Sequence, residues 1–182
     1  EIRYRNAIEP GKVLPNGQIA DCSTALKETL LAVKDAYESN PGRAGIACAM
    51  KNSGVGVGLP DKGRCKLAVR NGVVELYSAA SDIGQGCATV FLQMLAEATG
   101  LPLEKLRNMG ANSEVAPDSG TTSGSRQTLI TGEAVRMAAA DVLEALKEAG
   151  GDMSQLEGRE FFAEFFDPTD KLGADVPNPK SH

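Results

Sequence analysis

Three stretches of the chain place apolar residues at the three- and four-residue spacing of an amphipathic helix. They run over residues 23–38, over residues 87–99, and from Ser123 or Ser125 to Ala149, and each is followed by glycine or by Asn-Pro-Gly. The side chains expected to face a core include Leu30, Val33 and Tyr37 in the first stretch, Phe91 and Leu95 in the second, and Leu129, Ile130, Met137 and Val142 in the third. The pattern predicts three helices. Gly132 costs the last helix about 1 kcal/mol relative to alanine, so we expect another element to approach closely there.

Other segments have the composition of strands. Cys65–Arg70 and Val73–Ser78 are joined by Asn71-Gly72, a strong signal for a hairpin. The remaining candidates are the small apolar run Ala44–Asn52, the weaker segment Arg107–Ser113, and Arg159–Asp167, whose four phenylalanines need a partner. Together with the helices, these segments predict an α+β fold in which antiparallel strands pack against helices.

The chain is long enough for one domain with a substantial core. Residues 1–20 are rich in proline, glycine and asparagine, so we expect an extended lead-in over residues 1–22 and a single α+β domain over residues 23–182. The first residue is not methionine, and neither end has a distinct tail. We therefore expect a segment of a longer protein.

Composition narrows the classes of function. The formal net charge is −5 and the basic residues are scattered, which argues against a nucleic-acid-binding face. The only histidine is His182, so histidine-based triads and metal sites are excluded for this sequence. Four cysteines without a CxxC pair argue against an iron–sulfur or zinc site and are typical of reduced thiols in a cytoplasmic protein. No apolar run is long enough to span a membrane.

Two polar segments lie where helices are expected to begin. Ser81–Gly86 follows a predicted strand, and the hydroxyl-rich segment Asp118–Thr128 precedes the last helix. Backbone N–H groups at a helix N-terminus attract anions, and glycines let a ligand approach the main chain. Together the segments predict a cradle for a polar, phosphorylated ligand, although either alone is more typical of an ordinary capped turn. The sequences around Gly54-Val-Gly56 and Gly63-Arg-Cys65 lack the residues of dinucleotide-binding and P-loop motifs.

Together these segments resemble the large, molybdopterin-binding subunit of the xanthine dehydrogenase and aldehyde oxidase family. The resemblance rests on Arg5–Gly11, Ser81–Gly86, Pro117–Thr128 with Gly132–Ala134, and Leu172–His182, in the same order and spacing. It covers nearly the whole chain but only an internal part of that subunit, and bacterial members of the xanthine dehydrogenase type are the most similar. It implies an oxidoreductase that hydroxylates an aldehyde or N-heterocycle. Its cofactor would be molybdopterin in a dinucleotide form, whose dithiolene carries the molybdenum without a protein ligand.

The resemblance also implies cofactor contacts at nine positions. They are Gly84, Gln85, Gly86, Thr122, Ser123, Gly124, Ser125, Arg126 and Gln127. Gln85 would hydrogen-bond the cofactor between two glycines that let it approach, and the side chains or amides at 122, 125 and 127 would hold the pterin. The small residues at 123 and 124 would lie close to the molybdenum and the substrate. Two roles stay open for Arg126, neutralising a cofactor phosphate or forming a surface ion pair.

The rest of such an enzyme is expected outside this chain. No catalytic residue is expected within it, because the family's catalytic glutamate lies beyond His182. The implied partners are the remainder of the catalytic subunit, domains or subunits that carry iron–sulfur clusters and flavin, and a small-molecule substrate. The chain alone is expected to be inactive, and Phe161–Phe166 to promote self-association where a covering domain is missing. The alternative is a non-catalytic relative or interaction module that kept the fold and lost the cofactor.

Overall fold

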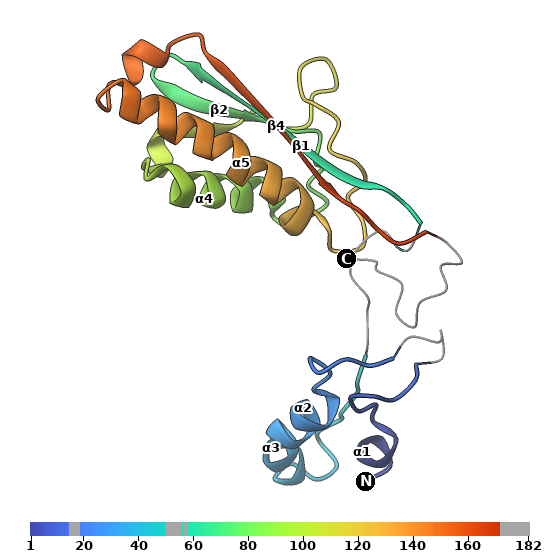
Figure 1. Ribbon diagram of the computed structural model, residues 1–182. Helices are drawn as coiled ribbons and strands as arrows, with labels where there is room; N and C mark the ends of the chain where they lie inside the picture. The colour runs from blue at the N-terminus through green and yellow to red at the C-terminus, as the bar shows by residue number, and fades with distance from the viewer. Residues whose placement is uncertain (15–18, 50–55, 57, 172–182) are drawn as a thin grey trace. The chain divides into compact units, whose positions relative to one another are not determined.

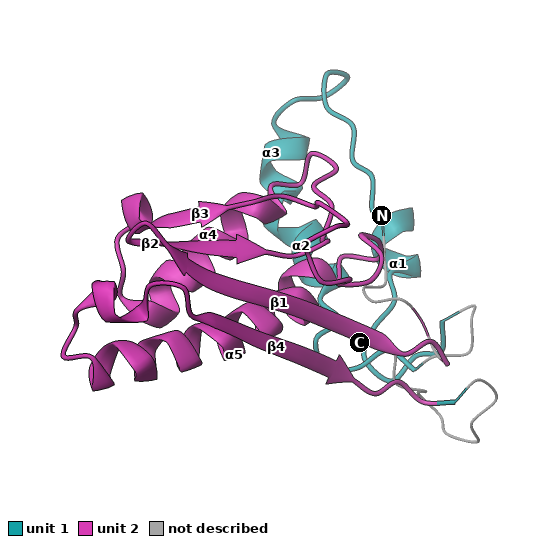
Figure 2. Ribbon diagram, turned by 90° about the horizontal axis from the view of Figure 1, so that it is seen from above, with its two compact units in different colours: residues 1–52, 171–180 teal, residues 53–170, 181–182 magenta. Residues whose placement is uncertain are grey.

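The computed structural model describes residues 1–14, 19–49, 56 and 58–171 (Figure 1). Its contacts divide the chain into two compact units, Glu1–Asn52 with Lys171–Lys180, and Ser53–Asp170 with Ser181–His182 (Figure 2). The boundary near residue 52 places the first predicted helix in the first unit. The expected division into a lead-in over 1–22 and one domain over 23–182 stays a prediction.

The first unit contains three short helices. They are α1 (Ile2–Asn6), α2 (Leu26–Ala32) and α3 (Lys34–Glu38). The last two replace the continuous helix expected over residues 23–38, because Val33, with φ −104° and ψ 2°, ends one helix and begins the next. Val33 and Tyr37, which we expected in a core, are exposed, whereas Leu30 is buried as predicted. The described part of this unit therefore has a thin apolar core.

Two further expectations for the first unit were wrong. Residues 1–20 were expected to be extended, but they include the helix α1. The predicted buried strand over Ala44–Asn52 is not formed by residues 44–49, which have no regular structure and are mostly exposed, and its last positions lie outside the described residues. A run of small apolar residues becomes a strand only where it has a neighbour to pair and pack with.

The second unit contains a four-stranded sheet in the order β3-β2-β1-β4. Its strands are β1 (Asp61–Arg70), β2 (Val73–Tyr77), β3 (Leu106–Asn108) and β4 (Glu160–Asp167). The predicted hairpin is confirmed, since Asn71 and Gly72 have φ of 52° and 69° and β1 pairs antiparallel with β2. β4 is also antiparallel to β1, but β3 runs parallel to β2, so the expectation of antiparallel strands fails for this pair. A helix connects β2 to β3, and such a crossover is what a parallel neighbour requires.

Two helices, α4 (Cys87–Thr99) and α5 (Gln127–Glu148), lie side by side and cover one face of the sheet (Figure 1). Their inward residues and those of the strands form one core, which includes Leu67, Val69, Leu76, Phe91, Leu95, Val135, Val142 and Leu156. Leu129 and Met137, expected in this core, are instead exposed on α5. An open sheet with packed helices confirms the predicted α+β class. No helix among the described residues combines the length and apolar composition needed to cross a membrane.

Two glycines allow close contacts of α5, one with α4 and one with β1. A Cβ atom at Gly132 would lie 2.6 Å from Met94 Cε, so the close approach expected at this glycine is confirmed, and α4 is the approaching element. A Cβ atom at Gly63 of β1 would lie 2.7 Å from Thr131 Cα. The first turns of α5 therefore rest directly on β1, which brings the polar segment before α5 close to the start of that strand.

The sheet face opposite the helices carries alternate side chains of β4. Phe161 is buried beneath the helices, whereas Phe162 and Phe166 are 57% and 47% exposed. The strand predicted from four phenylalanines does pair with β1, and Lys62 Nζ lies 5.9 Å from the centre of the Phe166 ring. The expected self-association of the isolated chain stays a prediction that these exposed rings support.

Candidate functional site

A pocket of about 370 Å³ in the second unit joins the two polar segments singled out in the sequence. Its lining comes from the turn before α4 and from the segment leading into α5. The lining residues are Ile83, Gln85, Cys87, Val90 and all positions from Thr122 to Thr128. Every predicted site residue except Gly84 and Gly86 therefore lines one pocket, although the two segments lie far apart in the sequence.

The turn before α4 is closed by its own carboxylate. Asp82 Oδ1 accepts hydrogen bonds from the backbone N–H groups of Gly84 (2.8 Å) and Gly86 (3.3 Å), and Oδ2 accepts one from that of Ala88 (3.4 Å). These bonds favour the charged form and hold the pKa of Asp82 below its ordinary value. The backbone N–H groups that we expected to face a phosphate are thus bonded to a protein anion, which corrects that part of the sequence interpretation.

The Gln85 side chain is turned back on the same turn. Its Oε1 accepts a hydrogen bond from the N–H of Ile83 at 2.6 Å, and its Nε2 donates to the Ser81 carbonyl at 3.3 Å. Left-handed backbone at Gly84 and Gly86, with φ of 102° and 80°, allows this tight path. The residue is exposed and its Nε2 bond is long, so the bond to the Ser81 carbonyl is weak.

A chain of hydrogen bonds connects this turn to the segment before α5. The Thr122 hydroxyl donates to the Ser81 carbonyl at 2.8 Å and accepts from Gln127 Nε2 at 2.9 Å. Gln127 Oε1 accepts from the hydroxyl of Thr131, one turn further along α5. Because the Ser81 carbonyl also accepts from Gln85, the amides and hydroxyls of both segments belong to one network along the pocket wall.

Arg126 is the most deeply buried of the predicted site residues, with 1% of its surface exposed. Its Nε donates to Asp61 Oδ1 at 2.5 Å. Its Nη1 donates to the carbonyls of Ser119 (2.8 Å) and Thr121 (2.9 Å), and its Nη2 to that of Lys62 (2.5 Å). Of the two roles left open for Arg126, the ion pair is formed, but it is buried and not at the surface, and protein groups surround the guanidinium.

The segment before α5 has an uncommon backbone conformation. Gly124 and Ser125 have φ of 61° and 60°, and for serine the left-handed conformation costs about 1–2 kcal/mol. Such strain persists only where surrounding contacts enforce it, and it gathers at functional sites. Residues 123–125, which include both left-handed positions, line the pocket just before the first turn of α5.

Two supporting groups were missed by reasoning from the sequence. The buried Ser119 hydroxyl lies 2.6 Å from that of Ser78 and donates to the Arg64 carbonyl at 2.5 Å. Asp61 pairs with Arg126, which follows it by 65 positions, and no local pattern links the two. The available signal was alternation along β1, which puts Asp61 on the same face as the buried positions 63 and 65.

Cys87 lines the pocket without the features of a nucleophile. It is buried, and both desolvation and the nearby negative charge of Asp82 raise the pKa of its thiol. Since the thiolate is the reactive form, Cys87 is a packing residue at neutral pH.

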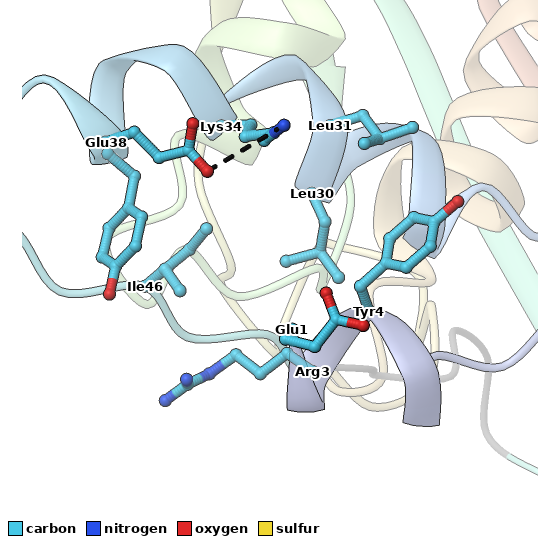
Figure 3. A pocket seen from close by; sticks show the side chains of 9 residues that line it. Glu1, Arg3, Tyr4, Leu30, Leu31, Lys34, Glu38 and Ile46 are labelled. Atoms are coloured by element: carbon cyan, nitrogen blue, oxygen red, sulfur yellow. Dashed lines mark ion pairs between the residues drawn. The ribbon is translucent and has the colours of Figure 1, made fainter.

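A separate pocket of about 410 Å³ lies within the first unit (Figure 3). Leu30 and Tyr4 contribute apolar surface to it, and Lys34 and Glu38 form an ion pair at 3.9 Å (Figure 3). An exposed pair one helical turn apart contributes little energy, and none of the predicted site residues lines this pocket. We therefore place the functional site in the second unit.

The donor set of the second unit's pocket suits an organic ligand. Its wall is rich in hydroxyl and amide groups, which both donate and accept hydrogen bonds. Over residues 1–14, 19–49, 56 and 58–171, no three His, Cys, Asp or Glu side chains are grouped to hold a metal ion.

Residues 25–170 match a family described as the molybdopterin cofactor-binding domain. The chain belongs to this family. The matched range includes both polar segments and the whole four-stranded sheet with its two covering helices. It confirms the family resemblance and the expectation of a molybdenum–pterin cofactor for proteins of this type.

Two relatives are similar over most of the chain. The aldehyde oxidoreductase of Megalodesulfovibrio gigas is 28% identical over 165 residues, which are 83% of this chain and 18% of the relative. A putative xanthine dehydrogenase molybdenum-binding subunit of Escherichia coli strain K12 is 32% identical over 154 residues, which are 76% of this chain and 20% of the relative. The chain thus spans about a fifth of the length of the relatives that it matches.

A solved structure of the aldehyde oxidoreductase from Desulfovibrio gigas has a related fold. The TM-score is 0.71 at 23% identity, over 99% of this chain and 22% of that one. At this identity the likeness concerns the fold, and it supports the α+β class independently of the sequence matches.

Proposed function

We propose that this chain forms part of the molybdopterin site of a molybdenum hydroxylase of the xanthine dehydrogenase and aldehyde oxidase type. Such an enzyme oxidises an aldehyde or an N-heterocycle. The observation that carries the proposal is the pocket in which Ser81–Gly86 meets the segment before α5, because the family resemblance rests on these two segments. Membership in the molybdopterin cofactor-binding family supports the same assignment.

In this proposal the cofactor contacts are polar or small residues of the pocket. They are Gln85, Thr122, Ser123, Gly124, Ser125 and Gln127. A pterin carries several donors and acceptors on the edges of its rings, to which a wall of amides and hydroxyls is complementary. Gly84 and Gly86 shape the turn that presents Gln85. Arg126 is no longer among the contacts, because protein groups surround its guanidinium.

The cofactor supplies the redox chemistry when bound, and the protein binds and orients it. Gln127 and Thr122 would present preset hydrogen-bonding groups, because each is already held by a neighbour in the network. The ionisable side chains that line the pocket are Cys87 and Arg126, and neither is available as a general base. A proton acceptor would therefore come from another part of the enzyme, as expected for the family's catalytic glutamate.

We also propose that further parts complete the enzyme. They are the remainder of the catalytic subunit and domains or subunits that carry iron–sulfur clusters and flavin. Two findings support this proposal. The chain spans only about a fifth of each relative, and one relative is described as a molybdenum-binding subunit. A reducing compartment such as the cytoplasm suits the four free cysteines.

The test is the molybdenum and pterin content of the full-length protein that contains this chain, purified from its native host. The proposal expects about one molybdenum and one pterin per chain, in line with a single cofactor site. Replacing Gln85 by alanine together with Thr122 by valine should lower both, whereas Arg136→Gln, on α5 outside the pocket, should lower neither. A folded protein that contains neither molybdenum nor pterin would contradict the proposal and favour the non-catalytic relative.

A further inference from the structure

We infer that the buried ion pair between Arg126 and Asp61 is a positioning device that holds residues 119–125 in the shape that binds the cofactor. The inference rests on the proposed function, because it assigns a role at the same pocket. It makes Arg126 a positioning residue that acts through its neighbours, in place of a group that meets the cofactor phosphate.

The pocket segment folds around the guanidinium. Nη1 binds the carbonyls of Ser119 and Thr121, and the residue between them, Gly120, has a left-handed φ of 72°. A Cβ atom at Gly120 would lie 3.2 Å from Arg126 Nη2 and from the Lys62 carbonyl. The backbone is thus wrapped closely enough around the guanidinium to leave little room for a side chain at position 120.

The guanidinium also joins this segment to β1. Nε meets the Asp61 carboxylate at 2.5 Å, and Nη2 meets the Lys62 carbonyl at 2.5 Å. The side chains of Arg126 and Asp61 are 0% and 3% exposed, so water does not compete for either charge. Only a planar fork of donors reaches one carboxylate and three carbonyls at once, and a lysine ammonium cannot reproduce that geometry.

The Arg126–Asp61 pair and the three carbonyls that Arg126 binds form a clamp, which fixes the groups proposed to meet the cofactor. Thr122 directly follows Thr121, whose carbonyl accepts from Arg126, and the Thr122 hydroxyl donates to the Ser81 carbonyl at 2.8 Å. Ser125 directly precedes Arg126 and has the strained φ of 60°. A segment tied at both ends to a rigid strand enforces that strain, and residues 122–125 are therefore preset before a ligand binds.

The experiment compares Arg126→Lys and Asp61→Asn in the full-length protein with a matched control pair. Arg136→Lys and Glu133→Gln alter an exposed ion pair of 2.6 Å on the same helix, outside the pocket. Four quantities are measured: pterin and molybdenum retained after gel filtration, the rate of subtilisin cleavage within residues 119–125, amide hydrogen exchange across the second unit, and the thermal unfolding midpoint. The expected result for both clamp variants is a loss of at least tenfold in retained pterin. Cleavage within 119–125 should be at least tenfold faster, the hydrogen exchange of β2 and of the second half of α5 should be unchanged, and the control variants should match the wild type.

Clamp variants that retain pterin and are cleaved within residues 119–125 at the wild-type rate would overturn the inference. Uniformly faster exchange throughout the second unit would also overturn it, because it would show a general structural role. If Arg126→Lys does not fold, Asp61→Asn becomes the deciding variant, since it keeps the shape of the side chain. If neither variant folds, the pair has a general structural role and the inference is overturned. A wild-type protein without molybdenum and pterin would contradict the proposed function, while the cleavage comparison would still decide whether the clamp positions the segment.

Discussion

The two segments that meet at the pocket are held in different ways. The turn Ser81–Gly86 is exposed and is closed by the carboxylate of Asp82 and the amide of Gln85. The segment before α5 is held by the buried guanidinium of Arg126, which binds two of its carbonyls and pairs with Asp61. Exposed hydrogen bonds open locally at little cost, whereas a buried charge network has to open as a unit. In the proposed site, one wall of the pocket would therefore adjust to the cofactor, while the other would keep its shape.

The largest effect that tests this difference is the removal of the buried acid. Asp61→Ala leaves the Arg126 guanidinium buried without its counter-ion, so the free energy of unfolding should fall by about 3–5 kcal/mol. Urea unfolding of the full-length protein, followed by a probe in the second unit, measures the loss. Asp141→Ala, on the exposed surface of α5, is the control and should change stability by no more than about 0.5 kcal/mol. Equal losses in the two variants would contradict the role given to the buried pair.

A smaller effect should follow from disconnecting the two segments. Thr122→Val removes the hydroxyl that links the Ser81 carbonyl to Gln127 Nε2, and it should cost about 1–2 kcal/mol. Hydrogen exchange should accelerate in the turn 81–86, whereas subtilisin cleavage within residues 119–125, which the clamp holds, should stay at the wild-type rate. Thr122→Ser keeps the hydroxyl and should behave as the wild type. Equal acceleration in both segments would show that they do not differ as proposed.

The exposed turn should show a pH dependence of its own. The pKa of Asp82 is lowered in the folded protein by the N–H groups of Gly84 and Gly86. Its contribution to stability is therefore complete above the unfolded-state pKa, near 4, and is lost as the pH falls through the lower folded-state pKa. Asp82→Asn should have a lower free energy of unfolding than the wild type at pH 7, and this difference should become smaller below about pH 4. Urea unfolding of both proteins at pH 7 and below about pH 4 measures this difference. A difference that does not change with pH would contradict the stabilising role given to the charged Asp82.

The smallest effect is expected where the two helices that carry the segments touch. Gly132→Ala places a methyl group against the flexible end of Met94 and gains helix propensity, so the net change in stability should be within about 1 kcal/mol of zero. Gly63→Ala is the contrasting variant, because its methyl group would meet main-chain atoms of Ile130 and Thr131 that cannot turn aside. It should be clearly more destabilising in the same unfolding measurement. If Gly132→Ala costs as much, the contact between the helices is more rigid than described.

Local patterns predicted the elements that local contacts stabilise. The Asn71-Gly72 hairpin and the bounds of α4 follow from turn residues and apolar spacing, and both are confirmed. The break at Val33 and the parallel position of β3 escaped prediction because they depend on packing and on the path of the chain between elements. Propensity within a short window carries no information about either.

For the site, composition indicated two segments that the structure brings together, but it misjudged how they are held. Hydroxyls and glycines pointed to the residues that line the pocket, and the structure does bring them together. The burial of Arg126 could not be predicted, because its partner Asp61 belongs to a distant strand. The carboxylate of Asp82 was overlooked as a competitor for the backbone N–H groups of its own turn, although an aspartate two residues before a glycine is a known turn signal.

The link between the two segments ends on a peptide carbonyl, that of Ser81. Every residue type carries this group, so the side chain at position 81 is free to vary without breaking the connection. Position 122, by contrast, is restricted to serine or threonine, because only a small hydroxyl can donate to that carbonyl while accepting from Gln127. A library of variants selected for cofactor retention should therefore be permissive at position 81 and narrow at position 122.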